Sequence, residues 1–357
     1  APYPSTKRTD RVTAITPLML TFALLPQAST QDPTELRRAV PDARSIIVDT
    51  TRHLPDRLVI KLAEGSGIAA RTALEAAVKP RSLVPYFAGL ETELAELRRR
   101  VVANTKPGAT VPADLSLYFD LTTHGLADTR ALLPRLNALA IVELAYPRER
   151  PTPPPSASLP VPFVSPPGDI PPLTPSFSAR QGYADAAPNG IDGGAIRQLT
   201  GAWGKNMTVL DIEWGWWFDH EDIQALRPSS LVGPPLSRTS FNNHGTAVSG
   251  EMAADADEWG VTGLTPDIKL LCTTNYPASG YSVARAIVAA MMRLRSGDVM
   301  LLEAQTRTPL GLGPTEWNQA DFDAIQNATR VGVITVEAAG NGNVNLDASQ
   351  LGGRFDL

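Results

Sequence analysis

The sequence predicts an α/β fold with a parallel sheet, preceded by a smaller α+β domain. Three observations lead to this prediction. From residue 180 onward, short apolar strands alternate with helical runs, which is the pattern of a parallel sheet with crossover helices. Residues 43–150 alternate strands with amphipathic helices, as a split βαβ sandwich does. A proline-rich stretch over residues 151–179 separates the two parts.

Length and composition agree with folded domains. The chain has 357 residues, enough for two or three domains with a sizeable core. Hydrophobic residues make up 43% and charged residues 19%, which excludes a mostly disordered chain. The net charge of −5 gives no general attraction to nucleic acid or to an anionic membrane, so neither is expected as a partner.

Two residue types limit the sites that the chain can form. Cys272 is the single cysteine, which excludes an intrachain disulfide and a cysteine-based metal site. The 4 histidines make a histidine-rich metal cluster improbable.

The segment 1–30 resembles a secretory signal. Lys7 and Arg8 precede a mostly apolar run over residues 12–25, and small and polar residues follow. Pro17 interrupts a run that is already short for a membrane span. We therefore expect a secreted protein; the alternative for this run is a buried strand or short helix of the first domain.

The predicted elements of the first domain follow from periodicity. Apolar residues alternate in the strands, recur every three or four residues in the helices, and Asp128 is the expected cap of the second helix. The expected order is a strand over 57–62, a helix over 90–102, a strand over 115–121, a helix over 129–139 and a strand over 141–146.

The second part follows the same reasoning. Proline recurs from Pro147 to Pro175, which blocks helix and sheet pairing, favours extended polyproline II and leaves the segment open to proteolysis. The elements expected beyond it are strands over 208–212, 268–272, 299–302 and 331–336, with helices over 283–293 and 322–329. In a parallel sheet, functional groups gather at the carboxyl ends of the strands.

Three motifs lie at or near such strand ends. Asp211 stands in Val-Leu-Asp-Ile-Glu-Trp-Gly, His244 opens His-Gly-Thr-Ala-Val-Ser-Gly, and Asn341 stands in Ala-Ala-Gly-Asn-Gly. The histidine motif is specific, whereas a strand-ending aspartate or a Gly-Asn-Gly turn is common by itself. Their order and spacing together make the pattern informative.

These motifs resemble those of the subtilisin-like serine proteases, the subtilases. The resemblance covers nearly all of residues 45–357 and implies a parallel-sheet subtilisin-like domain over 180–357, incomplete at its C-terminal end. It also implies that residues 43–150 are a ferredoxin-like propeptide, which acts as the chain's own chaperone and inhibitor. The implied function is that of a serine endopeptidase zymogen acting on polypeptides, with no cofactor in the chemistry.

The resemblance assigns a role to each motif. His244 would be the general base that takes the proton of a serine hydroxyl and returns it to the leaving amine. Asp211 would hold the imidazole tautomer, and the Asn341 amide would donate to the oxyanion. Gly245 would allow close packing of the helix that begins at the histidine, and Thr246 is small enough to fit there.

The sequence departs from the family directly after the aspartate and at the substrate-binding edge. The family has Ser or Thr and then Gly directly after the aspartate, but Ile212 and Glu213 follow Asp211 here. After the third strand the family has Ser-Leu-Gly at the substrate-binding edge, where this chain has Glu303-Ala304-Gln305. Glu303 in a specificity pocket would favour basic side chains; the alternative is a solvated or salt-bridged glutamate.

The nucleophile motif is the largest departure. The family's serine lies in Gly-Thr-Ser-x-Ala downstream of the asparagine, and no Gly-Thr-Ser occurs in these residues. We expect a chain truncated before its nucleophile, and therefore inactive alone. The alternative class is a non-catalytic pseudoprotease or peptide-binding, inhibitory module, and the residue at the Gly-Thr-Ser position after Leu357 would discriminate the two. A Rossmann-type nucleotide binder is disfavoured because no Gly-x-Gly-x-x-Gly stands at a strand–helix junction.

A structural calcium ion is a further implication of the resemblance. Asp222 matches a calcium-ligand position of the family, and Asp257 falls in the corresponding calcium loop. The alternative is a solvated acidic loop. His220 is expected to be structural, and the tryptophans at 214, 216 and 217 either line a substrate groove or pack as a cluster.

Overall fold

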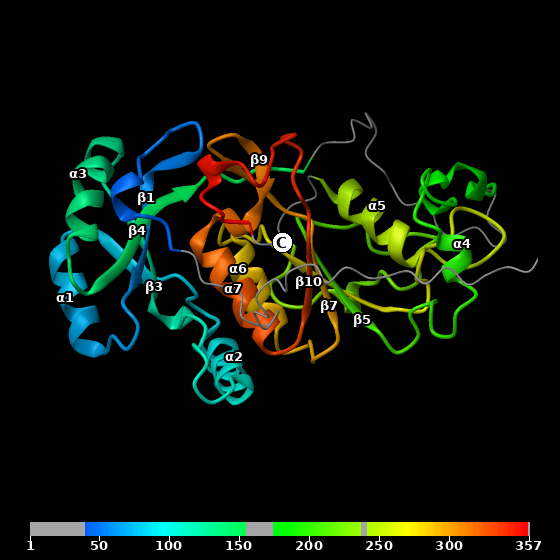
Figure 1. Cartoon of the computed structure of the whole chain (residues 1–357), viewed down its shortest axis with the longest axis horizontal. Helices are drawn as coiled ribbons and strands as arrows, with labels where there is room; N and C mark the ends of the chain where they lie inside the picture. The colour runs from blue at the N-terminus through cyan, green and yellow to red at the C-terminus, as the bar shows by residue number, and fades with distance from the viewer. Residues whose placement is uncertain (1–39, 155–173, 237–240, 356–357) are drawn as a thin grey trace, which may run out of the picture. The chain divides into compact units, whose positions relative to one another are not determined.

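The computed structural model describes residues 40–154, 174–236 and 241–355. The predicted signal segment and most of the proline-rich stretch lie outside these residues. The described residues belong to one compact unit (Figure 1). None of their helices combines the length and the apolar character needed to cross a membrane.

The first part of the chain is a four-stranded antiparallel sheet with three helices. Its order is β2-β3-β1-β4, so a third strand lies between the two strands that each helix α1 or α3 connects, as in the predicted split βαβ arrangement. The elements are β1 (His53–Leu62), α1 (Ile68–Val78), β2 (Ser82–Pro85), α2 (Glu91–Asn104), β3 (Tyr118–Thr122), α3 (Leu126–Asn137) and β4 (Val142–Glu149).

Several predicted boundaries in this part were wrong. Helix α1 and the four-residue strand β2 were not predicted, and the expected strand over 115–121 opens with a 3-10 turn. Helix α3 begins earlier than expected because Gly125, at φ 108°, turns the chain into it. Asp128 is inside the first turn, where its carboxylate accepts from the His124 N–H at 2.9 Å.

The second part is built on a parallel sheet, as predicted. Its strand order is β10-β7-β5-β6, and all neighbours are parallel. The elements are α4 (Gly193–Ile196), β5 (Thr208–Glu213), α5 (Asn242–Ala253), β6 (Lys269–Thr274), α6 (Val283–Ala290), β7 (Val299–Leu302), the hairpin β8 (Gln305–Thr308) and β9 (Gly311–Pro314), α7 (Gln319–Arg330) and β10 (Ile334–Glu337). Single 3-10 turns complete the described chain at 43–45, 115–117, 178–180, 182–184, 228–230, 315–317 and 349–351.

Alternation along β5 decides which helix each residue meets. Leu210 and Ile212 belong to the apolar cluster that contains α6 and α7. Asp211 and Glu213 have the opposite parity, so their side chains leave the other face of the sheet, where α5 lies. The sheet is therefore covered on both faces, and the acidic residues of β5 are directed toward the helix that carries His244.

The antiparallel sheet uses its two faces in the same way. Leu58 and Ile60 pack in a cluster with α1 and α3, whereas Val59 and Tyr118 belong to the cluster of α6 and α7. The Tyr118 hydroxyl donates to the Asp323 Oδ2 at 2.6 Å, and both groups are buried. The two parts of the chain therefore share one apolar core with buried polar contacts.

A buried carboxyl group at this contact makes the stability of the fold depend on pH. Burial raises the pKa of Glu149 to about 8 from an ordinary value of 4.5, with Asp321 adding repulsion and Asn318 and Arg52 opposing the shift. Its Oε2 is buried without a hydrogen-bond partner. As the pH rises, the unfolded chain loses this proton before the folded protein does. The contribution of Glu149 to the free energy of unfolding is therefore fully present below about pH 4.5 and is lost as the pH rises toward 8.

We expect the Glu149→Gln variant to be more stable than the parent chain at pH 9, by roughly 1–3 kcal/mol, because it removes a buried charge without a full set of partners. Near pH 5 the two should unfold at similar urea concentrations. Urea midpoints at both pH values measure this, with exposed Glu258→Gln as the control. An equal pH dependence in all three proteins would contradict the assignment to Glu149.

Candidate active site

Four polar side chains meet at the carboxyl edge of the parallel sheet. Glu213 is the last residue of β5, Glu303 follows β7, and Asn341 follows β10. His244 lies in the first turn of α5. Because parallel strands end at the same edge, the fold brings together residues that are up to 128 positions apart in the sequence.

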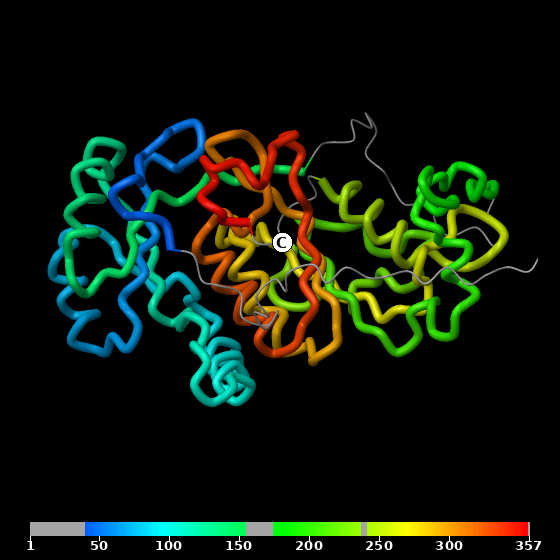
Figure 2. The backbone as a smooth tube through the Cα atoms, viewed as in Figure 1, coloured from blue at the N-terminus to red at the C-terminus, as the bar shows by residue number. Residues whose placement is uncertain are grey.

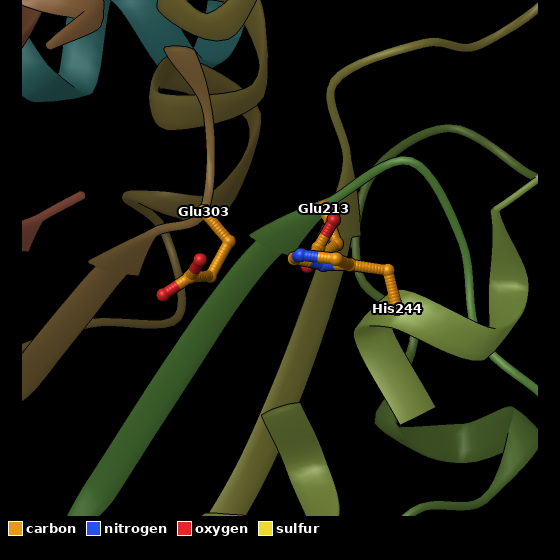
Figure 3. A group of neighbouring side chains, drawn as sticks. All are labelled: Glu213, His244 and Glu303. Carbon is orange, nitrogen blue, oxygen red and sulfur yellow. The ribbon is translucent and has the colours of Figure 1, made fainter. Parts of the chain in front are cut away.

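His244 is paired with Glu213. The imidazole Nδ1 makes a short hydrogen bond with the Glu213 Oε1 (Figure 3). The Glu213 side chain is fully buried, whereas 22% of the His244 side chain is exposed. Burial raises the pKa of Glu213 well above its usual value, and repulsion by Glu303 adds to the shift, while the Trp214 N–H opposes it by donating to Oε2 at 3.2 Å. The pair is thus a solvent-accessible imidazole held by a buried carboxyl group.

Asp211, which the motif predicted as the partner of His244, is not hydrogen-bonded to that histidine. Its Oδ2 accepts from the Trp216 indole N–H at 2.8 Å, and its Oδ1 is buried without a hydrogen-bond partner. It pairs across the sheet with Cys272 and lies two residues deeper in β5 than Glu213. Burial raises the pKa of Asp211 well above its usual value, with the neighbouring Glu213 adding to the shift. In the structure, the acidic partner of His244 is therefore Glu213 and not Asp211.

The sequence did contain a signal for Glu213. The family places a residue and then Gly directly after its acid, and Gly215 stands in that place only when the acid is Glu213. Trp214 then occupies the position of the usual Ser or Thr. If Gly215 is taken as the glycine of the family motif, the acid two residues before it is Glu213, which is the residue that contacts His244 in the structure.

The start of α5 is fixed against the loop that follows β5. A Cβ atom on Gly245 would lie 2.5 Å from the Gly215 carbonyl oxygen and 2.8 Å from the Trp216 Nε1. The Thr246 hydroxyl accepts from the Trp217 N–H and donates to the Asn242 carbonyl, both at 2.8 Å. The predicted close packing at the glycine is therefore present, and Thr246 adds hydrogen bonds that the motif did not indicate.

The Gly-Asn-Gly motif lies along the backbone of strand β9. A Cβ atom on Gly340 would be 2.7 Å from the Gly313 Cα, and one on Gly342 would be 2.2 Å from the Leu312 carbonyl oxygen. In Figure 2 the red tube that follows β10 passes beside the orange hairpin. Both glycines are therefore required by a close backbone approach, which sets the position of Asn341 between them.

Three of the predicted site residues line a small cavity of about 20 Å³. His244, Glu303 and Asn341 line it together with Gln305 and Pro154. The Gln305 Oε1 accepts from the Asn341 backbone N–H at 3.0 Å and from its side-chain amide at 3.1 Å. The Gln305 amide in turn donates to the Pro153 carbonyl at 3.1 Å. The structure thus brings the residue predicted for the oxyanion hole to the histidine, and it adds Gln305, which the sequence did not single out.

The beginning of the proline-rich stretch, directly after the first part of the chain, reaches this cavity. Thr152 is 4% exposed, Pro153 accepts from Gln305, and Pro154 lies in the cavity wall with His244. An extended, proline-containing segment therefore lies against the candidate site.

The two acids predicted to bind calcium lie away from this cavity. The Asp222 Oδ2 accepts from the Val261 N–H at 2.9 Å, and its Oδ1 is buried without a hydrogen-bond partner. Burial raises the pKa of Asp222 to about 7, and Asp257 and Asp255 add to the shift. An unpartnered carboxylate oxygen beside further acids fits a cation. Among the described residues, however, the cluster of three ligand side chains within 4.8 Å of one another lies at His244 and not here.

The aromatic residues near the site divide between core and surface. Trp214 packs edge-on against Phe241 and Tyr276, and Trp216 is 1% exposed, so both belong to a packed cluster. Trp217 and His220 instead line an apolar cavity of about 420 Å³ beside α5. Burial lowers the pKa of His220, which therefore stays neutral over a wider pH range than an exposed histidine.

Comparison with known proteins identifies a family for part of the chain. Residues 219–352 match the model of the Subtilase family, Peptidase_S8. Subtilisin DY of Bacillus licheniformis is 28% identical over 144 residues, which is 40% of this chain and 50% of that protein. The minor extracellular protease Epr of Bacillus subtilis (strain 168) is 25% identical over 149 residues, 40% of this chain and 22% of that protein. The chain thus spans half or less of the length of these two relatives.

The chain was also compared with solved structures, of which two are described here. Fervidolysin from Fervidobacterium pennivorans, described as a keratinolytic enzyme related to subtilisin, has 15% identity and a TM-score of 0.41 over 81% of this chain and 40% of its own. The epidermin leader peptide processing serine protease of Staphylococcus aureus has 15% identity and a TM-score of 0.44 over 84% of this chain and 63% of its own. The family match over residues 219–352 and the curated relatives agree with the resemblance seen in the sequence motifs, so this part of the chain is similar to the subtilisin-like proteases.

Proposed function

We propose that this chain carries the base and acid of a subtilisin-type serine endopeptidase, with His244 as the base and Glu213 as the acid. The observation that supports this most directly is the hydrogen bond between the His244 Nδ1 and the buried Glu213 carboxyl group. It lies at the carboxyl edge of the parallel sheet and beside Asn341, where the chemistry of acyl transfer needs a base and an amide donor.

The geometry divides the roles between the two groups. Glu213 takes up Nδ1, so the second ring nitrogen of His244 is left to accept a proton from a nucleophile. The carboxyl group holds the tautomer and stabilises the imidazolium that forms. The side-chain amide of Asn341 has two N–H donors, and the bond to Gln305 uses one of them, so the second would donate to the oxyanion. No Gly-Thr-Ser motif occurs in these 357 residues, so the nucleophile is left unassigned.

The remaining expectations extend this proposal. The protein would be secreted and would act on polypeptides, with Glu303 contacting the substrate at the cavity wall. No cofactor takes part in the chemistry. A structural calcium ion would be bound by Asp222 and Asp257, and the Asp222 Oδ1, which has no hydrogen-bond partner, would be one of its ligands.

We further propose that residues 43–150 are a propeptide that inhibits the catalytic part. Two contacts support this role: the shared core at α6 and α7, and the placement of Pro153 and Pro154 at the cavity with His244. An extended segment in this position would exclude a substrate from the same groove. If cleavage between the two parts left the rate of peptide hydrolysis unchanged while the first part was released, this role would be contradicted.

The test of the function is covalent labelling of the longest native chain that carries these residues. A fluorophosphonate probe reacts with a serine that a neighbouring base has activated. We expect one labelled serine, whose position mass spectrometry identifies, and loss of labelling in the His244→Ala variant. The His220→Ala variant, which changes a histidine that lines a different cavity, should retain labelling.

Two outcomes would count against the proposal. Equal labelling in the parent and in the His244→Ala variant would show that His244 is not the base. No labelling in any native form, combined with retained peptide binding, would instead support the non-catalytic peptide-binding module.

A further inference from the structure

We propose that Glu213, His244 and Glu303 bind a single zinc-class divalent cation, and that this ion reversibly blocks the histidine. The three side chains come from different elements: the end of β5, the first turn of α5 and the residue after β7 (Figure 3). This inference rests on the arrangement of ligand atoms and does not depend on whether the chain hydrolyses peptides.

The ligand atoms are already close to a coordinating arrangement. One nitrogen of His244 and one carboxylate oxygen from each glutamate all lie within 4.8 Å of one another. Bonds of about 2.0–2.2 Å in a tetrahedral site place neighbouring ligand atoms roughly 3.3–3.5 Å apart. The half-buried Glu303 side chain therefore has to approach by about 1.5 Å at most. The His244 Nδ1 and the Glu213 Oε1, which are joined by a short hydrogen bond, have to move apart so that the ion can lie between them.

The donor set suits this class of ion. Imidazole nitrogen and carboxylate oxygens are ordinary zinc ligands, and a set of three protein ligands leaves a fourth position open. His244 and Glu303 also line the cavity of about 20 Å³, which has room for one water molecule as the fourth ligand. Calcium and magnesium fit less well, because both prefer oxygen ligands to a nitrogen.

Local charge favours a cation as well. Two carboxyl groups flank one imidazole, and within the described parts of the chain neither forms an ion pair with a lysine or arginine. A buried carboxylate without a cationic partner is costly, and a divalent ion would neutralise both. An ion between Glu213 and His244 would bind Nδ1 in place of its proton. The proton of the neutral imidazole would then lie on the other ring nitrogen, so the metal-bound site would lack its base.

The test is a titration of the whole chain with Co²⁺, whose visible absorption reports coordination without any substrate. We expect one saturable site, displacement by Zn²⁺, and loss of the absorption in His244→Ala. Glu303→Gln, which keeps the shape of a half-buried side chain, should weaken Co²⁺ binding by roughly 100-fold. His220→Ala and Glu258→Gln are the matched controls and should bind as the parent does. Circular dichroism of each variant separates a lost ligand from a lost fold.

The outcomes are distinct. Unchanged Co²⁺ binding in folded Glu303→Gln, or loss of binding in Asp222→Asn instead, would overturn the assignment to these three residues. The titration uses no peptide and no nucleophile, so its result can be interpreted even if the labelling experiment fails. The labelling experiment can likewise be interpreted if no Co²⁺ binds.

Discussion

Glu213→Gln should lower kcat for peptide hydrolysis by about 10⁴-fold in the longest native chain, which is the loss known when the acid of a serine-protease triad is replaced by its amide. The amide is nearly isosteric, but it can present its N–H₂ to the His244 Nδ1. That contact would favour the wrong imidazole tautomer and place the proton on the nitrogen that must accept one. Steady-state kinetics with a peptide substrate measures the effect.

Asp211→Asn is the matched control, because it changes a second buried acid of the same strand. The asparagine oxygen can still accept from the Trp216 indole N–H, so kcat should fall far less than in Glu213→Gln. A larger loss in Asp211→Asn than in Glu213→Gln would restore the assignment that the motif suggested and contradict the one that the geometry supports.

Gly245→Ala should destabilise the fold by about 3 kcal/mol and displace His244. Its methyl group would lie 2.5 Å from the Gly215 carbonyl oxygen, and neither backbone can withdraw without moving the start of α5 or the loop after β5. A displacement of about 1 Å at the base would also cost roughly 100-fold in rate. Urea unfolding and peptide hydrolysis together report both effects.

Gly250→Ala in the same helix provides the comparison. Its methyl group would meet the Ile223 Cδ1 at 3.6 Å, an ordinary contact, and alanine favours a helix over glycine by up to about 1 kcal/mol. We therefore expect equal or greater stability and an unchanged rate. Similar losses in both variants would show that the effect of Gly245 comes from general disturbance of α5 rather than from its contact with Gly215.

The parallel sheet, the smaller α+β part and the position of the histidine motif could all be predicted from local sequence patterns. Period-two alternation distinguishes the residues of β5 that face α6 and α7 from those that face α5, because it depends only on backbone geometry. The His-Gly motif also predicted the tight helix start, since only glycine avoids a clash at Gly245. The four-residue strand β2 is too short to show alternation, and helix α1 was missed although its apolar periodicity is as strong as that of α2 and α3.

Strand alternation leaves open which acid pairs with His244; the three-dimensional contacts decide it, in agreement with the place of Gly215 in the motif. Asp211 and Glu213 leave the same face of β5, so alternation cannot separate them; their depth along the strand and the return of the Trp216 indole do. Gln305 is likewise positioned by a hairpin that packs against Asn341, far away in the sequence. Contacts of this kind depend on where separate strands end relative to one another, and local sequence patterns carry no information about that distance.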